Sequence, residues 1–541
     1  MRLSLLVVAS LLASVIACDA TEGDFTCVTD DDCEAGAQCQ FEADSVDGSC
    51  VPGECSIDAD CGDGTCTNGA CSGGEGEGEG EGEGEGEGEG EGEGEGEGEG
   101  EGEGEGEGEG EGEGEGEGEG EGEGEGEGEA PVLDEAAVRA LLAVGEINTT
   151  IEDLSRVYGW PIKLDNGDFF FVSTRGDRLN LAGDFNTFDP EPMTLEVVGG
   201  VFRYAWLVVA AEDGQGYKLV SPDEDVFQAD PRSRAYGFDD NGEISFTSRV
   251  GVSRTAYPDL YERHFNITLP GTTALLPRNV RVLLPTTTAT HVLYVHDGQN
   301  VFRRDSSIAT GYTVNFGGWK LDESNPAGLM IVAIDNTDER FFDYTPVPEP
   351  RSTFTSGPGG PIGGGAALYA TLVVDVIQPL VAAAYGEPAV RGVMGSSLGG
   401  LISLDIVDQY PDAFDFAAGL SSSFGWGSFD NPTSDDGDDT VIDRYRGAGV
   451  RETVLYIDSG GDDGTTCADA DGDGIKDDVN GGDSFCETAQ LRDVLLDEGY
   501  VLDDNFFYEH DPGLSGTGAE HREDAWEFRA RTIIVPLLMG L

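Results

Sequence analysis

The chain has 541 residues, of which 108 are acidic and 29 are basic, so its formal net charge is −79. Glutamate alternates with glycine from residue 75 to residue 129, and removing these 28 glutamates still leaves 80 acidic residues against 29 basic ones, a residual charge of −51. Such a negative field repels nucleic acid and anionic membrane surfaces, so nucleic acid is not expected as a partner.

Residues 1–17 have the pattern of an export signal. A positive charge at Arg2 precedes an apolar run that is too short for a transmembrane span and fits a signal peptide. The run ends Ser-Val-Ile-Ala before Cys18, which resembles the lipobox of bacterial lipoproteins. The resemblance implies cleavage before Cys18 and a diacylglycerol on its sulfur, which would anchor the exported protein at the bacterial cell envelope, at the outer membrane or cell surface. The alternative is a soluble secreted form that is cut elsewhere.

Residues 18–73 are a small cysteine-rich region. After Cys18, eight further cysteines lie at positions 27, 33, 39, 50, 55, 61, 66 and 71. An even number of cysteines in an exported segment with few large apolar residues predicts a disulfide framework, whose connectivity the spacing leaves open. Zinc is the less favoured alternative, because no histidine lies among these cysteines.

Residues 74–130 contain the alternating glutamate and glycine. A like charge at every second position, with no large apolar side chain to bury, predicts a disordered and self-repelling segment. We interpret it as a tether for the remainder of the chain.

Two further segments precede the C-terminal half. Residues 131–160 carry apolar residues at helical spacing, with Asp134 and Thr150 as candidate caps, and predict two short packing helices. Residues 161–254 alternate apolar and polar residues in short runs separated by Gly, Asp and Asn, which predicts an antiparallel β-sandwich.

This sandwich segment carries Gly-Asp-Phe-Asn at residues 183–186 and Asp-Pro at residues 230–231. With these motifs it resembles the immunoglobulin-like early-set domains, related to glycogen-binding modules, that precede many glycan-active enzymes. Those modules usually carry Trp where this chain has Phe188. Glycan binding and a purely structural spacer therefore both remain open.

Residues 255–541 alternate strand and helix patterns, which predicts an α/β fold with a doubly wound, mostly parallel sheet. One apolar run, residues 390–394, passes through Gly-Ser-Ser-Leu-Gly directly into an apolar-periodic helix. This is the strand, sharp turn and helix of a nucleophile elbow, in which only glycine fits two residues to either side of the nucleophile. Ser397 is the candidate nucleophile.

Six motifs follow one another in the C-terminal half: YVHDGQNVF, IDNTDERFFDYTP, GSSLGGLIS, YPDAFDFAAGLSS, YIDSGGDDG and GAEHREDAW. With them, residues 263–541 resemble the esterase D or "putative esterase" family of α/β-hydrolases, which includes enterochelin esterases and feruloyl or acetyl-xylan esterases. The resemblance implies an α/β-hydrolase fold and a serine carboxylic ester hydrolase with a Ser-His-Asp triad, acting on an acyl, glycan or siderophore ester.

A serine nucleophile needs an adjacent base, normally a histidine that a carboxylate orients. Because the α/β-hydrolase order is Ser, acid, His, only His510 and His521 lie downstream of Ser397 and could serve. His510 ends an alternating strand pattern. His521 follows a Gly-rich loop, and the family ending H-x-E-x-x-W falls on it, so His521 is preferred.

The acid is expected after the strand at residues 454–457. Asp458, Asp462 and Asp463 compete for this role, and Asp458 lies inside the strand pattern. The family's G-[TS]-x-D turn places the carboxylate on Asp463, with Asp462 as the alternative.

An oxyanion forms when Ser397 attacks a carbonyl carbon, and it needs two preset N–H donors. Leu398, the residue after the nucleophile, supplies one of them. The family resemblance assigns the other to the backbone of Gln299. The alternative for the Asp-Gly-Gln-Asn segment is an ordinary turn, since those residue types dominate turns.

Residues 467–486 form an acidic insertion. Oxygen ligands at loop positions 1, 3 and 5, glycine at 6 and aspartate at 9 fit a calcium loop, because a hard cation needs carboxylates converging from a tightly turned backbone. The candidate ligands are Asp469, Asp471, Asp473, Ile475 and Asp477. Asn480 stands where an EF-hand has glutamate, so the spacing resembles the short D-x-D-x-D-G repeats of extracellular proteins; an acidic solvated turn is the alternative. Cys467 and Cys486 are expected to pair across the loop.

The sequence therefore predicts an exported, lipid-anchored serine esterase that needs no cofactor for catalysis and carries a structural calcium ion. Its partners are expected to be an ester substrate and, through the lipid, a membrane. Two alternatives remain: a catalytically silent protein that binds surface glycans, and an acyltransferase on the same fold. The sequence does not indicate the oligomeric state.

Overall fold

The computed structural model describes residues 133–222, 226–302, 318–350, 360–428, 440–460, 467–469, 474–476, 483–510 and 521–541, and the backbone of five short strands nearer the N-terminus. The chain divides into two units, Met1–Glu119 and Gly120–Leu541. The predicted signal peptide, Cys18 and the glutamate–glycine tether lie outside the described residues.

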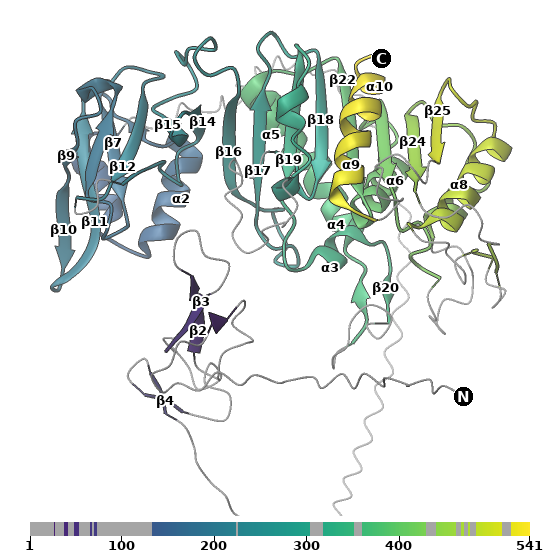
Figure 1. Ribbon diagram of the computed structural model, residues 1–541, viewed down its shortest axis with the longest axis horizontal. Coiled ribbons are helices and arrows are strands. Elements are labelled where there is room, and N and C mark those ends of the chain that lie inside the picture. The colour runs from purple at the N-terminus through teal and green to yellow at the C-terminus, as the bar shows by residue number, and fades with distance from the viewer. Residues whose placement is uncertain are drawn as a thin grey trace, which may run out of the picture. The chain divides into compact units, whose positions relative to one another are not determined.

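In the first unit the described strands are β1 (Thr26–Cys27), β2 (Ala37–Phe41), β3 (Gly48–Pro52), β4 (Thr65–Thr67) and β5 (Ala70–Ser72). They form an antiparallel sheet in the order β1-β3-β2 and a hairpin of β4 with β5 (Figure 1). The backbone register places Cys39 opposite Cys50, and Cys66 opposite Cys71.

The second unit holds the remaining elements (Figure 1). Its strands are β6 (Ile162–Lys163), β7 (Phe169–Ser173), β8 (Asn180–Gly183), β9 (Glu191–Pro192), β10 (Thr194–Val198), β11 (Val201–Val209), β12 (Gly216–Val220), β13 (Phe227–Gln228), β14 (Ala235–Asp239), β15 (Gly242–Phe246), β16 (Leu260–Ile267), β17 (Arg278–Leu284), β18 (His291–His296), β19 (Leu329–Ile334), β20 (Pro348–Glu349), β21 (Ile362–Gly363), β22 (Val390–Ser396), β23 (Phe416–Leu420), β24 (Val454–Ser459) and β25 (Phe506–His510). Its α-helices are α1 (Glu135–Leu142), α2 (Ile147–Tyr158), α3 (Arg340–Tyr344), α4 (Ala366–Thr371), α5 (Gln378–Tyr385), α6 (Leu398–Gln409), α7 (Val441–Tyr445), α8 (Phe485–Glu498), α9 (Glu523–Arg529) and α10 (Val535–Leu538). Short 3-10 turns are η3 (Asp184–Asn186), η4 (Gly298–Asn300) and η6 (Leu321–Ser324), and wider π-helical turns are η8 (Leu372–Ile377) and η9 (Ala530–Ile534).

Helices α1 and α2 follow the predicted lead-in, with one correction. The Asp134 side chain caps α1 by accepting a hydrogen bond from Ala137 N (2.7 Å). Thr150, the second candidate cap, lies inside α2 instead, where its hydroxyl donates to Glu146 O (3.0 Å). This back-bonding to the preceding turn is the usual alternative for a threonine within a helix.

Two sheets pack together where the sequence predicts a sandwich. Side chains on β7 alternate between two clusters, as the period of a strand requires. Phe170 and Val172 pack with the buried side chains of α1 and α2, whereas Phe169 and Phe171 face the other sheet, where the Phe171 ring lies 4.9 Å from that of Tyr217. The relationship to early-set domains stays a prediction.

One sheet of 14 strands, among the residues described, continues from these layers into the C-terminal half. Its order is β25-β24-β23-β22-β18-β19-β17-β16-β14-β15-β12-β8-β9, with β13 paired to β12. Because β14 pairs with β16 across the predicted domain boundary at residue 254, the boundary does not interrupt the sheet. The strands from β19 to β25 in this order run parallel.

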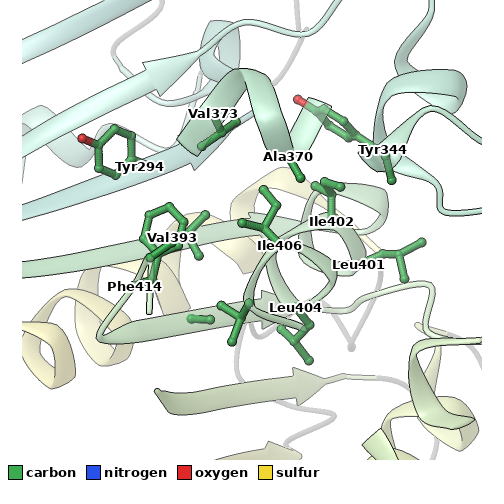
Figure 2. Close-up of a cluster of buried hydrophobic side chains, with 14 of the residues drawn as sticks. Tyr294, Tyr344, Ala370, Val373, Val393, Leu401, Ile402, Leu404, Ile406 and Phe414 are labelled. Atoms are coloured by element: carbon green, nitrogen blue, oxygen red, sulfur yellow. The ribbon is translucent and has the colours of Figure 1, made fainter. Parts of the chain in front are cut away.

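Helices cover both faces of the parallel part, which confirms the α/β doubly wound fold (Figure 1). On β18, Val292 and Tyr294 face the cluster built by α4, η8, α5 and α6, and Leu293 and Val295 face the cluster of η9 and α10. Figure 2 shows part of the first cluster, with Val373 of η8 on one side and the apolar side chains of α6 on the other.

The continuous helix Ala366–Tyr385 is apolar and long enough to cross a membrane by length and composition. Several of its apolar side chains belong to the protein core: Tyr369, Leu372, Val373 and Ile377 are fully buried in the core cluster. Packing in the core therefore accounts for these four apolar positions.

Candidate active site

Ser397 occupies a strained turn between β22 and α6. Its φ is 56° and its ψ is −124°, a backbone conformation that L-residues rarely adopt. A Cβ on Gly395 would lie 2.5 Å from the carbonyl group of Gly399, so the strand and the helix approach too closely for any other residue. This is the geometry of a nucleophile elbow, as the spacing predicts.

Three parallel strands end level beside this turn. Ser396 pairs in register with Leu420 on β23, and Leu420 pairs with Asp458 on β24. Ser397 N donates to Leu420 O (2.9 Å), which ties the elbow to the end of β23. Ligands of open α/β sheets bind at the carboxyl ends of the strands, and Ser397 lies at this edge.

The turn that contains Gln299 packs directly against the elbow. A Cβ on Gly399 would lie 3.1 Å from Asp297 Oδ2, so the two segments are in contact. The Gln299 side chain exchanges two hydrogen bonds with Asn336: Nε2 donates to Asn336 Oδ1 (2.6 Å), and Asn336 N donates to Gln299 Oε1 (3.1 Å). The backbone of Gln299 is therefore fixed beside the first turn of α6, which begins at Leu398.

Asp297 builds this turn through an ion pair that the sequence analysis did not identify. Arg340 Nε and Nη2 each donate to its carboxylate at 2.8 Å, and Asn336 Nδ2 donates to Oδ1 at 2.6 Å. Burial alone would raise the pKa of Asp297, but the Arg340 charge and these hydrogen bonds outweigh it and hold the pKa below its ordinary value. The signal was present in the HDGQN and IDNTDER motifs, but a motif does not reveal which side chains pair.

His521 contacts a carboxylate that is not the expected one. Its Nδ1 lies 3.1 Å from Oδ1 of Asp483, whose side chain is fully buried. Since an ionised carboxylate only accepts, Nδ1 carries the proton and Nε2 is left to accept one. The Trp526 ring lies edge-on to the imidazole, with ring centroids 4.7 Å apart.

Asp483 remains ionised because its hydrogen bonds outweigh burial. Burial raises the pKa of Asp483. The hydrogen bonds that it accepts from His521, from Ser421 Oγ (2.8 Å) and from Gly460 N lower the pKa by more than burial raises it, so the net shift is downward.

The structure brings a different carboxylate to His521 from the one that the sequence predicts, and the choice of Asp463 stays untested. Asp463 and its alternative Asp462 lie outside the described residues, and the carboxylate on His521 is Asp483, at the far end of the acidic insertion. Asp458 pairs with Arg529 (2.8 Å) instead, and burial raises its pKa to about 6. Asp483 lies in a Gly-Gly-Asp-Ser segment directly before the apolar-periodic helix α8, and this segment was the sequence signal that could have indicated it.

His510, the less favoured histidine, lies at the end of the edge strand β25. Its Nδ1 lies 3.1 Å from Ser459 O, and its ring lies 4.4 Å from that of Phe485. The Nδ1 atom of His521 thus contacts a carboxylate, whereas the Nδ1 atom of His510 contacts a backbone carbonyl.

The insertion is closed by a disulfide between Cys467 and Cys486, as expected, with their Cα atoms 5.4 Å apart. Of the candidate calcium ligands only Asp469 and Ile475 are described. Asp469 Oδ2 accepts a hydrogen bond from Gly474 N (3.2 Å), and the Ile475 side chain is buried in the core. Asp471, Asp473 and Asp477 lie outside the described residues, and the described part of the chain contains no cluster of three metal-ligating side chains.

Glu523 joins the segment that carries His521 to the turn that carries Gln299. Its carboxylate accepts hydrogen bonds from Asn300 Nδ2 (3.3 Å) and from Trp319 Nε1. Burial raises the pKa of Glu523 to about 7, although the Trp319 hydrogen bond opposes this. The carboxyl group therefore titrates near neutral pH.

Glu523 predicts a pH dependence of stability. Its pKa in the folded protein, about 7, lies above the ordinary value of 4.5, so the folded protein binds more protons between these values, and the stabilisation present below pH 4.5 is lost as the pH rises through 7. Glu523→Gln removes this contribution. Urea midpoints at about pH 5 and about pH 8 should therefore fall further with pH in the wild type than in the variant.

Asp524→Asn, at the exposed next position, is the matched control for loss of one negative charge on α9. The interpretation is contradicted if Glu523→Gln and the wild type show the same pH dependence.

Comparison with known proteins identifies the domain. Residues 274–530 match the family model described as "Putative esterase". The "Uncharacterized protein YbbA" of Bacillus subtilis (strain 168) is 28% identical over 137 residues, which cover 24% of this chain and 49% of that protein. The chain thus matches about half the length of this curated relative.

Similar solved structures include an IroE-like serine hydrolase from Shewanella oneidensis, with a TM-score of 0.36, 16% identity and coverage of 50% of this chain and 77% of that one. Another is the enterobactin esterase FES from Shigella flexneri, with a TM-score of 0.34, 12% identity and coverage of 69% and 93%. The family match is the basis of the assignment: residues 274–530 form a domain of the family described as "Putative esterase".

Proposed function

We propose that this protein is a serine carboxylic ester hydrolase in which Ser397 is the nucleophile, His521 the general base and Asp483 the carboxylate that orients it. The observation that carries the proposal is the 3.1 Å contact between His521 Nδ1 and Asp483 Oδ1. It fixes the tautomer in which Nε2 is free to accept a proton, which is the requirement for activating a serine hydroxyl. The strained turn at Ser397 supports the same role.

The reaction then follows from these positions. Ser397 Oγ attacks the ester carbonyl carbon while its proton passes to His521 Nε2, and the carbonyl oxygen becomes an oxyanion. The N–H of Leu398 stabilises this charge, because the first N–H groups of α6 have no acceptor within the helix. The backbone N–H of Gln299 is the second donor. Collapse expels the alcohol, which takes the proton from His521, and water then releases the acid by the same steps.

The substrate is an acyl, glycan or siderophore ester. Acyl transfer to an alcohol instead of water is the second activity that the same triad permits, since the first half of both reactions is identical. A catalytically silent glycan-binding protein is disfavoured, because such a protein has no use for a buried carboxylate held on the histidine.

The triad is tested by Ser397→Ala and Asp483→Asn in the full chain. Ser397→Ala should lower kcat for p-nitrophenyl acetate by about 10⁴- to 10⁶-fold, and Asp483→Asn by about 10⁴-fold, since the imidazole then loses the partner that sets its tautomer. Fluorophosphonate should label Ser397 in the wild type.

Asp463→Asn is the matched control, because it removes the acid expected from the family turn. The assignment of Asp483 is wrong if Asp463→Asn loses activity and Asp483→Asn does not. Labelling of another serine would overturn the proposed nucleophile.

We further propose that the mature chain is anchored through lipid on Cys18, as the lipobox resemblance implies. Cys18→Ser should move the protein from the membrane fraction to the soluble fraction, with esterase activity per molecule unchanged. Equal membrane retention of the variant would exclude the lipid anchor.

A structural calcium ion in the insertion is also proposed, held by Asp469, Asp471, Asp473, Asp477 and the backbone of Ile475. The hydrogen bond from Gly474 N to Asp469 Oδ2 brings the first and sixth positions of the predicted loop together, which supports this proposal. Calcium at about 100 times its Kd should stabilise the fold by about 2.7 kcal/mol, which thermal unfolding with and without chelator would detect. If a calorimetric titration of calcium into protein that has been freed of calcium and chelator shows no binding heat, the site is excluded.

A further inference from the structure

We propose that Ser421 is a positioning residue of this active site: held by Trp526 and Arg529, its hydroxyl donates to Asp483 and so fixes the carboxylate that orients His521. The proposal rests on the proposed function, because it assigns a role relative to that triad. Ser421 is fully buried at the end of β23, and neither the elbow nor the oxyanion turn contains it.

The direction of the Ser421 proton follows from its partners. Its Oγ has three neighbours: Trp526 Nε1 at 2.9 Å, Arg529 Nη2 at 2.8 Å and Asp483 Oδ2 at 2.8 Å. A hydroxyl has one proton and two lone pairs, whereas an indole N–H and a guanidinium can only donate. The two lone pairs of Ser421 are therefore occupied, and its one proton points at Asp483.

This donation decides which carboxylate oxygen serves His521. Asp483 Oδ2 accepts from Ser421 Oγ and from Gly460 N, and Oδ1 is the oxygen that faces His521 Nδ1. A buried carboxylate that loses a donor is left partly unsatisfied and can rotate to regain one. Without Ser421, Oδ1 is no longer held toward the imidazole.

Ser421 is itself held on two sides. Its φ is 46°, and its N–H donates to Asp458 Oδ1 (3.0 Å). The Asp458 carboxylate pairs with Arg529 (2.8 Å) and accepts from Tyr456 OH (2.8 Å), so the arginine that donates to Ser421 is fixed in turn. The hydroxyl has little freedom to turn away from Asp483.

The same contacts involve Trp526, the last residue of the GAEHREDAW motif, and Arg529, which follows it on α9. Trp526 and Arg529 are three residues apart on α9 and therefore lie on one face of the helix. The Trp526 indole donates to Ser421, and its ring packs edge-on against His521 at 4.7 Å. One side chain thus contacts the histidine directly and its carboxylate through Ser421.

The expected effect of Ser421→Ala is a loss in rate and a shift in pH dependence. Loss of one buried donor should lower kcat/KM by about 10- to 100-fold while KM changes little. Among the residues that the structure describes, the charged and titratable groups that interact with Asp483 are His521, Arg529 and Asp458. When Oδ1 is no longer held toward the imidazole, the carboxylate stabilises the protonated form of His521 less, so the acid limb of the pH profile should move to lower pH.

The experiment measures the rate of fluorophosphonate labelling of Ser397 against pH in the full chain. Four proteins are compared: the wild type, Ser421→Ala, Trp526→Phe, which keeps the ring and removes the N–H, and Ser422→Ala. Ser422 is the matched control, since it is the adjacent, fully buried serine and its Oγ has no hydrogen-bond partner among the described residues.

Ser421→Ala and Trp526→Phe should both label more slowly with the acid limb moved to lower pH, and Ser422→Ala should behave like the wild type. If Ser421→Ala does not fold, Trp526→Phe decides by the same criterion. The inference is overturned if the wild type labels at Ser397 and the folded variants match Ser422→Ala in rate and pH profile. A wrong proposed function gives a different result: the wild type would then not be labelled at Ser397. In that case the triad and the role of Ser421 would both be excluded.

Discussion

The buried carboxylate of Asp483 is the point at which the separate segments of this site meet. It accepts from His521, from Ser421 at the end of β23 and from Gly460 just after β24. An ionised carboxylate cannot be buried without such donors, since its desolvation would otherwise cost several kcal/mol. The burial of Asp483 therefore requires all three segments to be in place at once, and the arrangement of the site depends on the ends of the parallel strands being level.

That edge of the sheet also concentrates backbone strain. Ser397, Ser421, Asp297, Asp483 and Ser484 all have positive φ, which costs an L-residue of the order of 1–3 kcal/mol each. The core supplies the stability that makes this strain tolerable, because helices cover both faces of the parallel strands and bury their side chains. Strain is thus held at the side where substrate would bind, and close packing lies beneath it.

Local sequence patterns made several features of the fold and the candidate site predictable. The elbow and the pairing of Cys467 with Cys486 each depend on spacing along the chain, and the structure has the geometry that each requires. The choice of His521 over His510 stays a prediction, and the contact of His521 with Asp483 supports it. The contact between Asp483 and His521 was not predictable, because an insertion separates Asp483 from β24 and spacing no longer indicates which aspartate returns to the histidine. The continuation of the sheet from β16 to β14 was missed for a related reason: strand pairing across a domain boundary is long-range and leaves no local signal.

The most direct test of this account is a crystal structure of the full chain inhibited by a fluorophosphonate. The account predicts a covalent bond from phosphorus to Ser397 Oγ, a phosphoryl oxygen within hydrogen-bond distance of Leu398 N and Gln299 N, and His521 Nδ1 on Asp483. An adduct on another serine, or an aspartate other than Asp483 on His521 in the inhibited enzyme, would contradict it.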